Sequence, residues 1–239
     1  MKKLLLITAF LFTVTSATSQ VLISILLGDK LNSDKLEFGL DGGLNLSTIQ
    51  GQKGADLAER FNIGFYFDLK LKNPAWMIHT GVIVKSTMGA KDLPVYSLND
   101  ASLDAAFEGG KVDRRLNYFN VPILIKRLFK NKFSLEAGPM LGLMNKSVDV
   151  FTQKVKEEDD LTYEIKIRDN YHPLDAGFVV GAGYRLMGGN GMNLGVRYYM
   201  GLVDITIDDA TTNQYNRSLY FCVGIPIGKG KKEVKKENP

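Results

Sequence analysis

The chain has 239 residues, a single cysteine and a formal net charge of +4. One cysteine excludes an intramolecular disulfide, so packing and backbone pairing must hold the fold together. The positive charge resides at the two ends, in Lys2 and Lys3 and in a tail after Ile227 that carries an excess of three positive charges. The rest of the chain is close to neutral, which excludes a nucleic-acid-binding surface based on overall basic charge.

The first nineteen residues have the pattern of a secretory signal peptide. Lys2 and Lys3 precede an apolar run from Leu4 to Val14, and small residues follow up to Ser19. A membrane-spanning helix would need roughly 18 or more apolar residues, and this run is shorter. The sequence therefore predicts export, with a signal peptide at 1–19 and cleavage before Gln20.

Downstream, apolar and other residues alternate with a period of two, which is typical of strands with two different faces. Residues 61–71 show the pattern most clearly, because Phe, Ile and Leu side chains occupy every second position from Phe61 to Leu71. The segment before the first strand, 20–35, is predicted to lie against the periplasmic rim. The eight predicted strands cover residues 36–47, 61–71, 75–86, 116–128, 132–145, 172–186, 192–206 and 216–227.

The lengths of the connections indicate how these strands are arranged. Short turns follow the second, fourth and sixth strands, whereas longer polar loops follow the first, third, fifth and seventh. Short turns on one rim and long loops on the other are typical of an outer-membrane barrel. We therefore predict an all-β fold, an eight-stranded antiparallel transmembrane β-barrel over residues 36–228, followed by a basic and disordered tail at 229–239.

The apolar faces of these strands are expected to contact lipid and the opposite faces to line the lumen. The opposite faces are rich in Gly and charge, which disfavours a soluble lipocalin-like barrel with an apolar interior. The lumen-facing polar network is predicted to contain Glu37, Asp41, Asp68, Lys70, Lys85, Lys126, Glu136, Arg185 and Arg197. An aromatic girdle near the rim of the short turns is predicted to contain Phe38, Trp76, Phe133 and Tyr184.

Three runs resemble a known family. The first strand, Leu36-Glu37-Phe38-Gly39-Leu40-Asp41-Gly42-Gly43-Leu44-Asn45-Leu46-Ser47, is similar to that of the porin-like outer-membrane β-barrel family of Bacteroidetes, which includes the PorT-type proteins. The run from Asn120 to Lys126 resembles its fourth strand, and Leu135 to Pro139 its fifth. The resemblance implies residence in the outer membrane of a Gram-negative bacterium, in contact with outer-membrane lipid and the barrel assembly machinery.

No catalytic, cofactor-binding or metal-binding pattern is present. His79 and His172 are too far apart for a ligand pair, and Gly224 to Lys229 lacks the spacing of a phosphate loop. We therefore predict a structural or interaction protein that is not an enzyme, needs no cofactor and binds no nucleic acid. The alternatives are a narrow porin-like channel or a small-ligand binding barrel and, with less support, a membrane-embedded hydrolase.

The third long loop, 146–171, is the candidate interaction site. Two runs of alternating residues, around Val150 and around Tyr163, flank an acidic tip at Glu157 to Asp160. This pattern predicts that the fifth and sixth strands continue beyond the membrane as an extracellular β-hairpin. Such a hairpin offers backbone edge groups and apolar side chains to extracellular or envelope protein partners.

Overall fold

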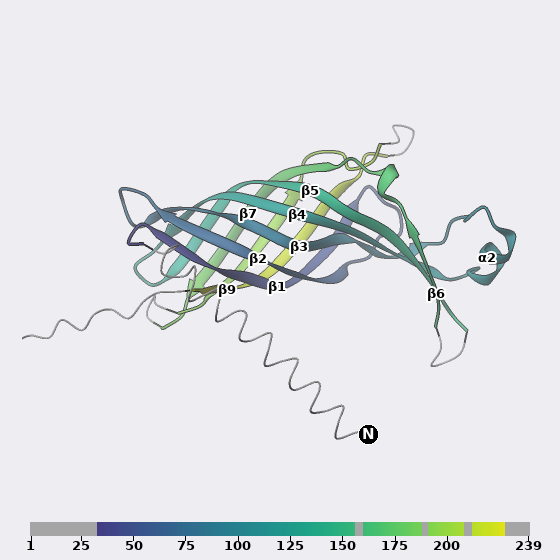
Figure 1. The fold of residues 1–239 in the computed structure, drawn as a ribbon, viewed down its shortest axis with the longest axis horizontal. Helices are drawn as coiled ribbons and strands as arrows, with labels where there is room; N and C mark the ends of the chain where they lie inside the picture. Colours follow the sequence, from purple (N-terminus) through teal and green to yellow (C-terminus); the bar gives the residue numbers. More distant parts are fainter. Residues whose placement is uncertain (1–32, 156–159, 188–190, 208–211, 228–239) are drawn as a thin grey trace, which may run out of the picture.

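The computed structural model of the chain describes residues 33–155, 160–187, 191–207 and 212–227 (Figure 1). These residues form one long antiparallel sheet rolled around a horizontal axis, with a slender extension at one end. Within the described ranges, no helix is long and apolar enough to cross a membrane.

Nine strands and two short helices make up the described fold. The helices are α2 (Ala101–Ala106) and the 3-10 helix η1 (Arg168–Asn170). The strands are β1 (Leu36–Gln50), β2 (Ala58–Lys70), β3 (Trp76–Pro94), β4 (Lys111–Leu128), β5 (Phe133–Lys154), β6 (Asp160–Lys166), β7 (Leu174–Arg185), β8 (Asn193–Gly201) and β9 (Tyr215–Pro226).

The sheet closes into a barrel of eight strands. Its order is β4-β3-β2-β1-β9-β8-β7-β5-β6, and an additional β4–β5 pairing joins the two sides. Closure gives every barrel strand two neighbours, so backbone donors and acceptors are satisfied without water, as a lipid environment demands. The prediction of an eight-stranded antiparallel barrel is confirmed; β6 is a ninth strand that pairs with β5 outside the ring.

Short turns and both described chain ends share one rim. β1 begins at Leu36 beside the end of β9, where Gly39 pairs with Pro226. The predicted signal peptide (1–19), most of the 20–35 segment and the 229–239 tail lie outside the described residues, so they stay predictions.

Beyond the opposite rim, three barrel strands continue as a sheet extension, which we define as the β3 residues after Thr87, the β4 residues before Leu116 and the β5 residues after Lys146, together with β6 and α2. Figure 1 shows β6 and α2 at the end of this extension. The predicted hairpin exists, but β6 is its second arm, since η1 separates β6 from β7. The side chains of the predicted acidic tip, Glu157 to Asp160, lie outside the part of the chain that the structure describes.

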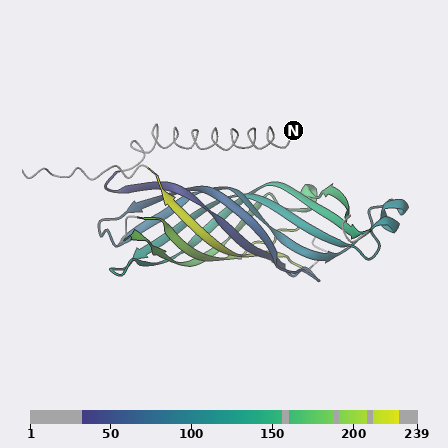
Figure 2. The same cartoon turned by 90° about the horizontal axis from the view of Figure 1, so that it is seen from below.

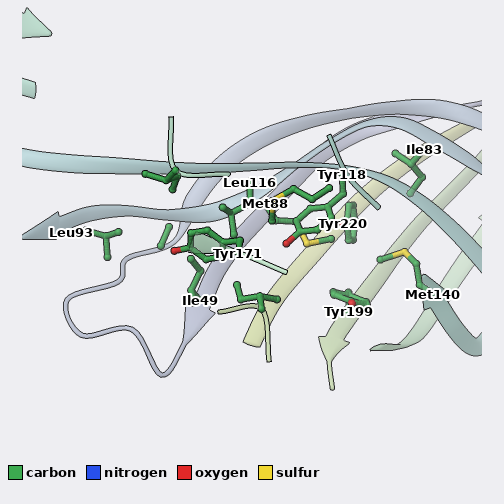
Figure 3. Close-up of a cluster of buried hydrophobic side chains, with 14 of the residues drawn as sticks. Ile49, Ile83, Met88, Leu93, Leu116, Tyr118, Met140, Tyr171, Tyr199 and Tyr220 are labelled. Carbon is green, nitrogen blue, oxygen red and sulfur yellow. The ribbon is translucent and has the colours of Figure 1, made fainter. Parts of the chain in front are cut away.

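The barrel's outer face is apolar, whereas its interior has two kinds of filling. Exposed Phe, Leu, Ile and Val side chains cover the outside, as in Phe65, Ile123, Leu141 and Val196. Figure 2 shows the barrel's tilted strands from a second side. Inside, one apolar cluster runs from the middle of the lumen into the extension, with Met140 near one end and Leu93 near the other (Figure 3).

Candidate functional site

The half of the lumen nearest the short turns holds a network of buried charges. Its first group centres on Glu37, which is 3% exposed. Arg185 Nη2 donates to Glu37 Oε2 at 2.5 Å, and the Tyr66 hydroxyl donates to Glu37 Oε1 at 3.0 Å. Strands β1, β2 and β7 supply these residues, so the contacts connect three strands across the interior of the barrel.

A second group surrounds Asp68. Lys126 Nζ donates to Asp68 Oδ2 at 2.9 Å, and His79 Nδ1 lies 2.6 Å from Asp68 Oδ1. His79 Nε2 lies 2.9 Å from Arg197 Nη2. Because a guanidinium can only donate, Nε2 must accept, which assigns the ring proton to Nδ1 and directs it at Asp68. One tautomer of His79 therefore links the second group to the third.

Arg197 of β8 is the centre of the third group. Its Nη1 donates to Asp41 Oδ2 at 2.6 Å, and its Nε donates to Glu136. All these carboxylates are at least 92% buried, so each needs a cation and hydrogen bonds to stay charged away from water. The three groups together account for seven of the nine predicted lumen residues.

The charged network leaves little free space. The cavity among Asp41, His79, Glu136 and Arg197 has a volume of about 20 Å³. Since one water needs roughly 10–15 Å³ of such volume, the cavity holds one or two waters. A second cavity, beside Met140 and further along the lumen, measures about 10 Å³. Side chains therefore fill most of the lumen around the charged network and beside Met140.

Above the charges lies a layer of hydrogen-bonding side chains that carry no formal charge, with the exception of the Asp175 carboxyl group. The Tyr220 hydroxyl lies 3.1 Å from Ser86 Oγ, which also accepts from Asn120 Nδ2 at 2.9 Å. Asn216 Nδ2 donates to Asp175 Oδ2 at 2.8 Å and to the Tyr118 hydroxyl at 3.1 Å. Sequence alternation assigned such residues to the polar face without showing that they form a separate layer.

Two of the predicted lumen residues lie elsewhere. Lys85 is exposed on the outer face, because β3 has a bulge: Ile83 opposes Gly64 but Lys85 opposes Ile63, which shifts the alternation by one residue. Lys70 ends β2 at the rim, where it is exposed and donates to the Asp34 carbonyl at 3.0 Å. The interior position predicted for these two lysines is therefore corrected.

The structure also adds residues that the predicted network omitted. His79 and Tyr66 alternate in phase with Asp68, so the strand pattern alone could have placed them in the lumen. Cys222 is buried, with its Sγ 3.7 Å from Arg197 Nη1. Among the described residues, no group of three or more His, Cys, Asp or Glu is arranged to hold a metal ion.

Three of the four predicted girdle aromatics are exposed at the rim of the short turns. Trp76, Phe133 and Tyr184 occupy strand ends there, and Phe133 pairs with Tyr184 across β5 and β7. Arg127 stacks over Trp76 at 5.2 Å from the ring centroid. Phe38 also lies on the outer face near this rim, where it pairs with Phe67, but it packs against Phe65 and Phe67 and is only 5% exposed.

A buried ion pair between Arg114 and Asp149 stabilises the sheet extension. Arg114 donates to both carboxylate oxygens of Asp149, at 2.8 and 2.6 Å, and the Tyr96 hydroxyl donates to the same group at 2.9 Å. Burial raises the pKa of Tyr171 to about 12. Burial and the Asp149 carboxylate raise the pKa of Tyr96 above its ordinary value. These phenols therefore stay neutral at physiological pH.

Aromatic packing holds the tip of the extension in shape. Phe107, just after α2, packs edge-on against Phe151 at 5.8 Å between ring centroids and lies 6.3 Å from Tyr163. Asp100 caps α2 by accepting from two backbone N–H groups. The segment between β3 and β4 is thus folded against β5 and β6.

Strand β6 is an edge. It pairs with β5 from Val148 to Lys154 and, within the part of the chain that the structure describes, with no other strand. Leu161 and Tyr163 are 38% and 40% exposed. An exposed edge presents unpaired N–H and C=O groups that another extended chain can meet.

Comparison with known protein families agrees with this architecture. Residues 29–206 match the family model described as an outer membrane protein beta-barrel domain. No curated protein sequence matches the chain. Among solved structures, it is similar to Ail, the attachment invasion locus protein of Yersinia pestis, with a TM-score of 0.44 and 11% identity over 82% of this chain and 100% of that one. It is also similar to Neisserial surface protein A (TM-score 0.38, 9% identity, 80% and 96% coverage) and to OprG of Pseudomonas aeruginosa (0.33, 13%, 80% and 91%).

Proposed function

Because the chain belongs to the outer membrane protein beta-barrel domain family, we propose that it is a closed barrel whose sheet extension binds other proteins outside the cell. The family locates the chain in the outer membrane of a Gram-negative bacterium. The finer assignment to PorT-type proteins of Bacteroidetes is part of the proposal, supported by the three strand runs that resemble that group.

The free edge of β6 carries the proposal. An extended segment of a partner can add to such an edge as a further strand, with backbone hydrogen bonds giving affinity and alternate side chains giving specificity. Leu161 and Tyr163 point to the same face of β6. On that face Tyr163 packs against Phe107, which in turn packs against Phe151. We expect a partner segment with apolar residues at every second position.

The filled lumen favours binding over transport. A cavity of about 20 Å³ among charged side chains gives no continuous path for a hydrated ion or a sugar. The channel alternative therefore requires the network of Asp68, Glu136 and Arg197 to open. An enzymatic role is not part of the proposal, since the charged side chains in the lumen form ion pairs with one another.

The edge can be tested by adding charges that disfavour strand pairing. The double variant Leu161→Lys/Tyr163→Lys alters exposed side chains only, so the barrel should keep its heat-modifiable mobility on gels. Protein in nanodiscs should bind extended peptides with alternating apolar residues, measured by fluorescence anisotropy, and the variant should lose that binding. Leu57→Lys, an exposed leucine in another loop, is the matched control and should bind as the wild type does.

A deletion extends the test to the whole hairpin. Removing residues 150–166 joins Asp149 to Ile167, whose N–H already bonds to the nearby Ser147 carbonyl at 3.1 Å. We expect a folded barrel that no longer binds peptides. If the deletion prevents folding, or if the charged variant binds like the wild type, β6 is not the binding edge. Single-channel steps of the wild type in planar bilayers would instead support the channel alternative.

A further inference from the structure

Two β-bulges turn lysines outward at the same level of the barrel. In β3 the bulge lies between Ile83 and Ser86 and exposes Lys85. In β5 an extra residue, Asn145, lies between the partners of Tyr118 and Asn117, and it exposes Lys146. Bulges commonly redirect a side chain at a barrel rim. Here, regular alternation would have directed Lys85 into the lumen.

These lysines line an open groove on the outside of the barrel, with a volume of about 520 Å³. Strands β1 to β6 contribute its walls. Four cationic side chains and two carboxylates line it: Arg60, Lys85, Arg115 and Lys146, with Glu59 and Glu164. The groove therefore has an excess of positive charge.

The ionic contacts leave capacity for an anion. Arg60 and Arg115 share one carboxylate, Asp113, and Lys146 pairs with Glu164 at 3.0 Å. The ammonium of Lys85 has no hydrogen bond or ion pair among the described residues. A phosphate could bind Lys85 and draw on the guanidinium groups, which match its geometry through paired N–H donors.

The position of the groove identifies the source of that phosphate. Its lower wall contains Leu44 and Phe61, which are 59% and 50% exposed and begin the apolar band on the outer face. Cations directly above lipid-facing side chains lie at the depth of lipid headgroups. We propose that this groove binds the phosphate groups of a phosphorylated glycolipid in the outer leaflet, with acyl chains against Leu44 and Phe61.

The experiment uses full-length protein purified from outer membranes into detergent. Titration with micelles of diphosphorylated lipid A, followed by calorimetry, gives the affinity, and the same lipid after phosphatase treatment shows the share due to phosphate. The double variant Lys85→Gln/Lys146→Gln should bind the phosphorylated lipid about 2- to 30-fold more weakly, as expected for the loss of two surface ionic contacts. Its affinity for the dephosphorylated lipid should not change.

Two controls make the result specific. Lys72→Gln/Lys130→Gln removes the same charge from exposed lysines in the short turns and should bind like the wild type. Lys85→Arg/Lys146→Arg should retain binding, because the cations remain. Equal affinity for both lipids, an unchanged Gln variant, or an equal loss in the short-turn control would overturn the proposal. Full competition by inorganic phosphate would assign the groove to a soluble anion and overturn the lipid assignment.

Discussion

Arg197 is the side chain whose removal should reveal how much the lumen network stabilises the barrel. It is the shared cation of Asp41 and Glu136, and it also fixes His79 through a 2.9 Å contact. Removing one partner of a buried ion pair costs about 3–5 kcal/mol, because a charge remains buried without compensation. Arg197→Met keeps most of the side-chain volume and leaves two such carboxylates. We therefore expect a loss at the upper end of that range.

Urea unfolding in phospholipid vesicles would measure this loss, with the fluorescence of Trp76, the one tryptophan of the chain, as the signal. Arg115→Met is the matched control, since its ion pair with Asp113 is exposed and should be worth less than about 1 kcal/mol. Adding Glu136→Gln to Arg197→Met should recover part of the loss by removing one unpaired carboxylate. If Arg197→Met and Arg115→Met unfold alike, the network does not hold the barrel.

Three further outcomes are expected. Val196→Arg places a charge on the lipid face and should cost about 2–4 kcal/mol in the same unfolding assay; wild-type stability would invert the inside–outside assignment. Because the pKa of Tyr171 is raised, its neutral form stabilises the fold fully below the ordinary phenol pKa of about 10, and this stabilisation is lost as pH rises towards 12. The Tyr171→Phe variant should therefore lack the phenolate absorbance change that the wild type shows near pH 12. A cysteine at Asn99 should react with an impermeant label on intact cells and one at Asn73 should not, and the reverse pattern would refute the topology.

The barrel itself could be predicted because most of each strand alternates with a period of two. The segment 61–71, for example, keeps its Phe, Ile and Leu side chains on one face, and the alternation of short and long connections then determines the direction of each strand. The charged residues Glu37, Asp68 and Arg197 follow from the same pattern. Their partners do not, because contacts across the lumen join strands far apart in sequence.

The errors occur where the period breaks. The bulge before Ser86 reverses the faces of β3, so a rule based on alternation places Lys85 on the wrong side. A second irregularity between Ala90 and Leu93 hides the continuation of β3, and the polar residues around it resemble a loop. The apolar upper interior was also missed, since Tyr118 and Tyr220 count as polar in the pattern although their rings fill the lumen.

The sheet extension sets a fixed reach above the lipid. After Thr87, β3 continues through residues 88–94, and at about 3.3 Å per residue these seven residues span at most roughly 23 Å. Hydrogen bonding to β4 and β5 keeps this span from collapsing onto the membrane. Under the proposed function, the β6 edge would therefore stand at a constant height above the lipid. A surface layer taller than the extension would then conceal this edge from partners, and a shorter layer would expose it, without any change in the protein.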